Sequence, residues 1–165
     1  MRLQISIQLD AANRIIGAAL ASARVEKMLP LTVVVLDVTG KIIASQSEDG
    51  SGLLRFDVAR GKAWGALGMG MSSRLIRDRL ATRPSFQAAL ATVSDGKFIP
   101  VPGGVLVLDV DGSVIGAVGV SGDTSEKDEY CAISGIAAVG LRSEPDSADQ
   151  NWQNSSLKGP NAGSA

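Results

Sequence analysis

Basic and acidic side chains that could bind an organic acid or move a proton are concentrated in two stretches of the sequence. Residues 55–83 carry seven basic side chains against two acids, and residues 109–129 carry six acids against one lysine. Because a guanidinium binds a carboxylate through two parallel hydrogen bonds, the basic stretch is predicted to bind an anionic ligand. The residues predicted for this role are Arg55, Lys62, Arg74 and Arg83.

The two charged stretches also allow other interpretations. They could be solvated faces joined by ion pairs within the chain, each of which contributes little free energy at a surface. They could also be complementary patches on different subunits of an oligomer. Nucleic acid is not a predicted partner, because the net charge is −1 and the basic stretch lacks interleaved aromatic side chains.

Carboxylates and one lysine are the candidates for acid–base catalysis, because the chain contains no histidine. The lack of an imidazole excludes Ser–His and Cys–His nucleophiles and an ordinary zinc site, and no metal site is predicted. Burial or a neighbouring like charge can raise the pKa of a carboxyl group into the range needed for proton transfer. The candidates are Glu48, Asp49, Lys62, Asp123 and Glu126, with their individual roles left open.

The sulfur-containing side chains are interpreted first as structural. Cys131 is predicted to be a small buried residue with no obvious base beside it. Met69 and Met71 are interpreted as packing residues, with haem ligation as the minority alternative.

A glycine-framed hairpin is the segment most typical of a ligand-holding element. Two β-branched runs, residues 105–110 and 114–120, flank an Asp-Gly turn, which favours positive φ at both central positions. Gly103-Gly104 and Ser121-Gly122 stand at the two outer ends, where we expect exposed backbone to contact a small ligand. Amides there could also stabilise a developing oxyanion. The acids that follow Gly122 argue against phosphate at this end.

The elements that must position these residues follow from hydrophobic periodicity and from Gly, Pro and capping signals. Helices are predicted over residues 10–29, 53–68, 72–80, 84–93 and onward from 124, and strands over 31–38, 41–46, 98–101, 105–110 and 114–120. Strand pairs joined by hairpins and mixed with helices predict an α+β fold, with a five-stranded antiparallel sheet and helices on both faces.

Length and composition fit one domain over residues 1–141, followed by a polar tail over residues 142–165. The tail is predicted to be disordered, or alternatively to dock on a neighbouring subunit through Trp152 and Leu157. No apolar run is long enough for a membrane helix, the N-terminus lacks a secretory pattern, and one cysteine fits a reducing cytoplasm. The expected location is therefore cytoplasmic, with no membrane partner.

Four motifs resemble one known family. They are LTVVVLDVTGKIIA at residues 31–44, SEDG at 47–50, ARGKAWGA at 59–66 and VPGGVLVLDVDGSVIGAVGVSG at 101–122. The sequence is similar to the GlcG/HbpS-like family of small proteins linked to haem binding, which also occurs as the C-terminal domain of PduO-type corrinoid proteins. The resemblance implies a profilin-like three-layer α/β/α fold, homo-oligomers and small-molecule pockets near subunit contacts.

The resemblance favours a small-molecule binding protein for haem or another tetrapyrrole, oligomeric and accessory to a catabolic pathway. Without histidine, an axial haem ligand would have to be Met, Cys, Tyr, Lys or a weak oxygen donor. The alternative is a cofactor-independent lyase or isomerase acting on a small carboxylated or aromatic metabolite. The expected partners are thus an organic anion or tetrapyrrole and further copies of the chain, which could also form a purely structural oligomer.

Overall fold

The fold is built on one antiparallel sheet. The computed structural model describes residues 6–157. In this part of the chain the strands lie in the order β2-β1-β4-β3-β5, and every neighbouring pair is antiparallel. The strands are β1 (Thr32–Asp37), β2 (Ile42–Ser47), β3 (Gly104–Leu108), β4 (Val114–Ser121) and β5 (Arg142–Glu144). The prediction of a five-stranded antiparallel sheet is confirmed.

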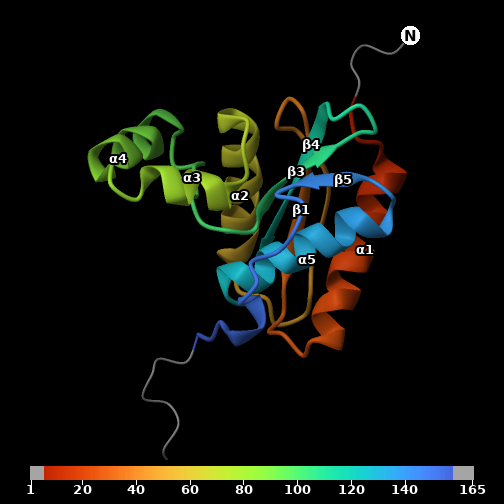
Figure 1. Ribbon diagram of the computed structural model, residues 1–165. Helices are drawn as coiled ribbons and strands as arrows, with labels where there is room; N and C mark the ends of the chain where they lie inside the picture. The colour runs from red at the N-terminus through yellow and green to blue at the C-terminus, as the bar shows by residue number, and fades with distance from the viewer. Residues whose placement is uncertain (1–5, 158–165) are drawn as a thin grey trace, which may run out of the picture.

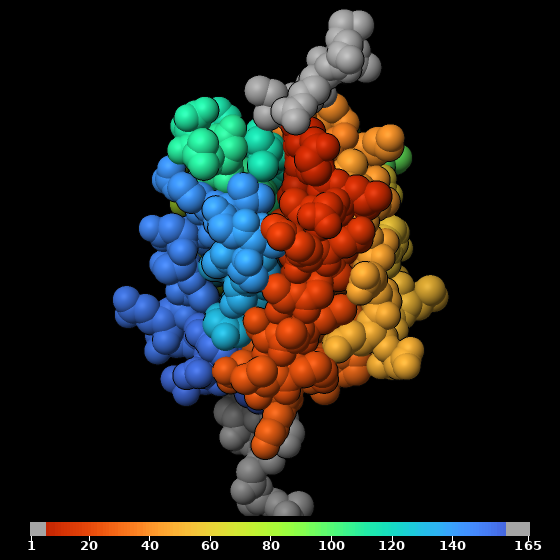
Figure 2. Space-filling view, turned by 90° about the vertical axis from the view of Figure 1, so that its right-hand side faces the viewer, coloured from red at the N-terminus to blue at the C-terminus, as the bar shows by residue number. Residues whose placement is uncertain are grey.

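Helices cover both faces of the sheet, as predicted (Figure 1). On one face α1 (Leu9–Val25) and α5 (Ser125–Ala138) lie side by side, which Figure 2 shows from outside the molecule. On the other face lies α2 (Arg55–Met69), followed by α3 (Ser73–Leu80) and α4 (Pro84–Val93), which project away from the sheet. The three-layer α/β/α arrangement is confirmed.

Local signals account for the ends of these helices. Pro84 stands in the first turn of α4, where its missing N–H has no helical partner to lose. The side chain of Thr124 accepts a hydrogen bond from the Lys127 amide and caps α5. The buried side chains of α1 recur every three or four residues, which gives this helix one apolar face toward the sheet.

The identity of the fifth strand was predicted wrongly. Residues 98–101 form no strand, because Pro100 and Pro102 lack the amide that a ladder needs and Phe98 is buried against Ile76 and Leu80. The edge position beside β3 is taken instead by β5, where Leu106 pairs with Glu144.

The C-terminal segment is docked on its own chain. Beyond β5, Arg74 donates a hydrogen bond to the carbonyl of Ser147, and the Trp152 ring stacks on Tyr130 at a centroid distance of 3.8 Å. The segment includes the short 3-10 helix η1 (Trp152–Asn154). We call residues 142–155 the C-terminal strap. These contacts give residues 142–155 a defined path on the chain, whereas docking on a neighbouring subunit stays a prediction. Leu157 is exposed, and residues 158–165 lie outside the described residues.

Close backbone packing holds α2 on the sheet. A Cβ atom at Gly119 of β4 would overlap the carbonyl oxygen of Ala59, and one at Gly104 would overlap that of Lys62. These glycines let α2 approach the strands, so the core on this side is built mainly from small side chains. Among the described residues, no helix has both the length and the apolar character required to cross a bilayer.

Candidate functional site

Several of the predicted ligand residues converge on a buried ion pair. The Lys62 ammonium, on α2, donates to a carboxylate oxygen of Asp128 at 2.8 Å and to the carbonyl of Val120 at 3.0 Å. Lys62 and Asp128 are 2% and 1% exposed. Burial raises the pKa of Asp128 to about 6 even though the charge of Lys62 opposes the shift. The pair joins α2, β4 and α5 in the interior.

The glycine ends of the hairpin lie next to this pair and are closed by packing. Gly103, Gly104, Ser121 and Gly122 are all buried, so the expectation of exposed backbone is wrong. The amide of Gly104 donates to the Ser73 hydroxyl at 2.8 Å. Lys62 of α2 and Ser73 at the start of α3 cover Gly103 and Gly104, and Pro30 and Leu31 pack against Gly122.

Three of the predicted catalytic carboxylates lie in loops, and the fourth, Glu126, lies in the first turn of α5. Glu48 accepts from the Leu31 amide at 2.8 Å, and Asp49 is exposed. Asp123 accepts from the Leu29 amide at 2.9 Å and from the amide of its own neighbour. Burial alone would raise the pKa of Asp123, but these hydrogen bonds and the charge of Lys127 outweigh it and hold the pKa below its ordinary value. Both bonded carboxylates therefore stabilise the loop before β1.

Ion pairs within the chain join the two charged stretches. Arg77 lies 3.5 Å from Glu126, and Arg74 lies 3.3 Å from Glu129. The remaining predicted cation near the hairpin, Arg55, donates to the Ser121 hydroxyl at 3.3 Å. This arrangement supports the interpretation of the opposite charges as partners inside one subunit.

Glu129 is a functional candidate that the sequence reasoning missed. Its side chain is fully buried on α5, and neither oxygen accepts a hydrogen bond from the described residues. Burial raises the pKa of Glu129 to about 7, against the lowering effect of Arg74 and Arg77. A carboxyl group with this pKa can hold or release a proton near neutral pH. The sequence offered one signal for this candidate: two adjacent acids, Asp128 and Glu129, lie on a predicted helix that packs against the sheet, so at least one of them could be buried.

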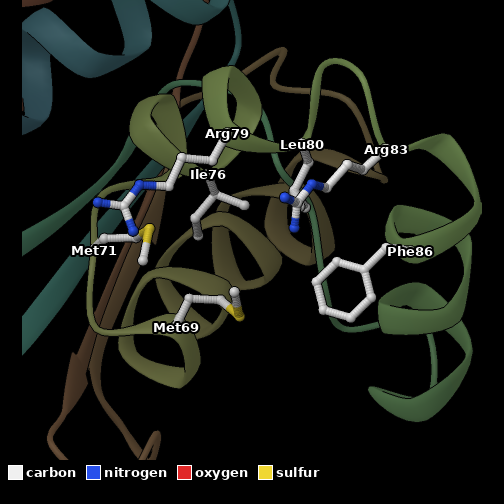
Figure 3. A pocket seen from close by; sticks show the side chains of 7 residues that line it. All are labelled: Met69, Met71, Ile76, Arg79, Leu80, Arg83 and Phe86. Atoms are coloured by element: carbon white, nitrogen blue, oxygen red, sulfur yellow. The ribbon is translucent and has the colours of Figure 1, made fainter.

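An apolar pocket with a basic rim lies between the end of α2, α3 and α4. Its volume is about 290 Å³, and it is lined by Met69, Met71, Ile76, Arg79, Leu80, Arg83 and Phe86. Figure 3 shows the Met69 side chain and the Phe86 ring reaching toward this space from α2 and α4. Of the residues predicted to bind an anion, Arg83 is the one that lines this pocket.

A second pocket adjoins the first, because Met69 lines both. Its volume is about 180 Å³, and its walls include Trp64, Leu90 and Phe98. Both pockets border α4, through Phe86 in the first and Leu90 and Val93 in the second, and we call the two together the α4 groove. Across the described residues, no group of three or more His, Cys, Asp or Glu side chains is placed to hold a metal ion.

Comparison with protein families matches residues 7–137 to a family described as "Haem degrading protein HbpS-like". The chain belongs to the HbpS-like family. The resemblance inferred from the four sequence motifs is thereby confirmed. The chain is similar in sequence to an uncharacterized 15.0 kDa protein from the dhaT–dhaS intergenic region of Citrobacter freundii. It is 32% identical over 127 residues, covering 77% of this chain and 87% of the relative.

Solved structures share this HbpS-like fold. Klebsiella pneumoniae protein ORFY is 27% identical, with a TM-score of 0.73 and coverage of 84% of this chain and 94% of that one. A PduOC:haem complex has a TM-score of 0.76 at 24% identity, covering 85% and 99%. A double mutant of Streptomyces reticuli HbpS has a TM-score of 0.70 at 23% identity, covering 83% and 89%. At these last two identities the likeness establishes the fold alone.

Proposed function

We propose that this HbpS-like protein binds a tetrapyrrole of the haem type in the α4 groove. The observation that carries the proposal is the first pocket, which combines apolar walls with two thioether sulfurs and two guanidinium groups. The family description, and the haem bound by PduOC, support the choice of ligand.

The side chains of the groove fit the chemistry of such a ligand. A methionine thioether is an established axial ligand of haem iron, and Met69 and Met71 offer it in a chain that has no histidine. Arg79 and Arg83 would bind the propionates, since guanidinium groups pair with carboxylates. The first pocket, at about 290 Å³, is at the lower edge of ligand-site volumes, so the macrocycle would extend past Met69 into the second pocket. Bound haem would supply a redox-active iron.

The exposed apolar side of α4 supports assembly into a homo-oligomer. Within the described residues 6–157, no side chain of α4 is buried, and Phe86 and Val93 are 48% and 80% exposed. Subunits that met along α4 would cover these side chains and close the groove. A cytoplasmic location, suggested by the single unpaired and buried cysteine, and an accessory role in a catabolic pathway complete the proposal. Light scattering tests the assembly, and a monomer at all concentrations would contradict it.

Haem titration followed by absorption spectroscopy tests the ligand. Met69→Ala and Met71→Ala are compared, and the Soret band is expected to shift in the variant that loses the axial sulfur. Arg79→Met and Arg83→Met should each raise the Kd by about tenfold, the loss expected for one charge-assisted hydrogen bond. Arg14→Met, at an exposed arginine on α1 across the sheet, is the matched control. Binding no stronger than that of a nonspecific carrier, or four variants indistinguishable from the wild type, would overturn the proposal.

A cofactor-independent lyase or isomerase is the second candidate, and one observation favours it. Arg74 and Glu129 lie 3.3 Å apart, which places a carboxylate-binding cation beside a buried acid whose pKa is raised to about 7. Such an enzyme would exchange a carbon-bound proton of a hydroxy or oxo acid with solvent. Proton NMR in D₂O over a panel of these acids would detect the exchange, which Glu129→Gln should abolish. No exchange with any acid of the panel would remove this candidate.

A further inference from the structure

A separate pocket lies between the first half of α2 and the turn that follows α4. Its volume is about 250 Å³, and its lining residues are Asp57, Arg60, Gly61, Asp95, Gly96 and Lys97. No residue of this lining also lines either pocket of the α4 groove. We call this cavity the α2 pocket, and a ligand bound there would leave the proposed tetrapyrrole site free.

Close packing holds the two walls of the α2 pocket together. A Cβ atom at Gly61 would lie 2.5 Å from a side-chain carbon of Ile99 and 3.1 Å from the carbonyl oxygen of Lys97. One turn further along α2, a Cβ atom at Gly65 would lie 3.1 Å from the ring of Phe98. Because α2 rests directly on residues 97–99, the spacing between the two walls is set by the backbone.

Two opposite charges on α2 line this pocket and are unpaired. Asp57 and Arg60 stand three residues apart, a spacing at which opposite charges on a helix can pair. On α1 the comparable residues Asp10 and Arg14 do pair, at 3.6 Å. Within residues 6–157, neither Asp57 nor Arg60 takes part in an ion pair, and the Arg60 Nε atom is buried without a hydrogen-bond partner. Both charges are therefore available to a ligand, and the guanidinium keeps unused donors for a carboxylate.

The opposite wall adds one more charge of each sign. Lys97 and Asp95 lie 3.9 Å apart, and their side chains are 42% and 94% exposed, so their pairing contributes little free energy. The lining thus carries two positive and two negative charges. A simple anion or a simple cation would meet two like charges as well as two opposite ones. A molecule that carries both charges would match this lining better than either.

We infer that the α2 pocket binds a small zwitterion of the α-amino-acid class, with its carboxylate on Arg60 and its ammonium group on Asp57. Three residues of a helix span about 4.5 Å along the axis, which suits a compact molecule whose two charged groups are attached to one carbon atom. The volume lies below the range of about 300–1,000 Å³ that holds drug-sized ligands, so the ligand is small. The inference goes beyond tetrapyrrole binding in the α4 groove and does not depend on it.

Titration of the wild-type protein, followed by the amide chemical shifts in ¹H–¹⁵N NMR spectra, tests the inference. Each standard amino acid is added singly, and the one that binds most tightly is compared with its analogues that lack the amino or the carboxyl group. The amides of residues 57–61 and 95–97 should shift and saturate. Each analogue should bind with a Kd about tenfold higher, the factor expected for one charge-assisted hydrogen bond. If no amino acid shifts these amides, or if either analogue binds as tightly as its parent, the inference is overturned.

Two variants separate the two contacts of the ligand. Arg60→Gln should raise the Kd of the amino acid and of its carboxylate analogue by about tenfold and leave that of the amine analogue unchanged. Asp57→Asn should weaken the amino acid and the amine analogue and spare the carboxylate analogue. Arg14→Gln and Asp10→Asn, at the paired residues of α1, are the matched controls and should leave all three Kd values unchanged. Equal weakening of all three ligands by Arg60→Gln and by Asp57→Asn would overturn the site, whatever the outcome of haem titration.

Discussion

The two faces of the sheet differ in how their helices are held. On the α1 and α5 face, a continuous cluster of buried isoleucine, valine, leucine and alanine side chains joins both helices to the strands. On the opposite face, α2 is held by close backbone contact and by Lys62, while α4 buries none of its side chains among the described residues. The difference separates a face that stabilises the fold from one whose outer helices carry the α4 groove.

The looser face is where a ligand would have the largest effect. Few buried apolar contacts hold α3 and α4, and such regions open at a lower free energy than the core of a domain. A ligand bound in the α4 groove would order α3 and α4. The face covered by α1 and α5 would gain little further stability from a ligand, because its side chains are already buried. The following predictions test this separation between a face that stabilises the fold and a face proposed to bind a ligand.

The largest effect is expected from breaking the buried ion pair under α2. Lys62→Met leaves the Asp128 carboxylate buried without its partner, which should lower the free energy of unfolding by about 3–5 kcal/mol. Urea denaturation measures the loss. Lys97→Met, which removes an exposed ion pair with Asp95, is the control and should change the free energy by less than about 1 kcal/mol.

Replacing both members of the pair should recover much of this loss. In Lys62→Met combined with Asp128→Leu no charge is left buried, and such replacements are often neutral or stabilising. A double variant as unstable as Lys62→Met alone would show that the pair contributes through geometry and packing as well as through its charges.

A matched pair of truncations compares the two faces directly. Ile15→Ala on α1 removes a fully buried side chain, and the free energy of unfolding should fall by about 2–5 kcal/mol. Phe86→Ala on α4 removes a half-exposed ring and should change it by less than about 1 kcal/mol in the monomer. Equal losses in thermal and urea unfolding would contradict the proposed difference between the faces.

The sequence predicted the sheet well because its inner strands carry strong local patterns. The apolar run before Thr39-Gly40 and the Asp111-Gly112 turn both predict hairpins, and the structure pairs β1 with β2 and β3 with β4 accordingly. β5 carries no such pattern, since a three-residue strand gains its pairing only from the edge that β3 presents. Residues 98–101 were predicted as the fifth strand from their apolar composition alone, and the structure forms no strand there.

The sequence indicates which residue types the candidate sites contain, but not how these residues are arranged. The basic stretch contributes arginines to two separate places, since Arg83 lines the α4 groove while Arg74 lies beside Glu129, and the binding role predicted for them stays a prediction. Which helix face each residue occupies depends on long-range packing, which a single sequence does not specify. The raised pKa of Glu129 likewise follows from burial, and burial is set by the tertiary fold.

The stability of the wild-type protein should depend on pH through Glu129. Burial raises the folded-state pKa of Glu129 from 4.5 to about 7, so the folded protein binds this proton more tightly than the unfolded chain does. The resulting stabilisation is fully present below about pH 4.5 and is lost as the pH rises through about 7. Its magnitude is on the order of 3 kcal/mol from the linkage of pKa to free energy.

Glu129→Gln isolates this contribution, because an amide keeps the shape of the neutral acid and does not titrate. Between pH 5 and pH 7.5, its free energy of unfolding should fall less steeply than that of the wild type. Glu26→Gln, at an exposed acid that follows α1, should keep the wild-type slope. Parallel curves for Glu129→Gln and the wild type would show that Glu129 does not titrate over this range.

The smallest effect is expected where the C-terminal strap crosses to α5, the helix of the stabilising face. Trp152→Ala removes the ring that stacks on Tyr130 at a centroid distance of 3.8 Å. Loss of this stacking should lower the free energy of unfolding by about 0.5–1.5 kcal/mol, in addition to the contribution of the apolar surface that the ring buries. The change should be local, because β5 joins the sheet at its edge, beside β3. Amide hydrogen exchange should therefore accelerate across residues 142–155 and stay unchanged in β1 and β4. If exchange accelerated in β1 and β4 as well, the strap would belong to the stabilising core.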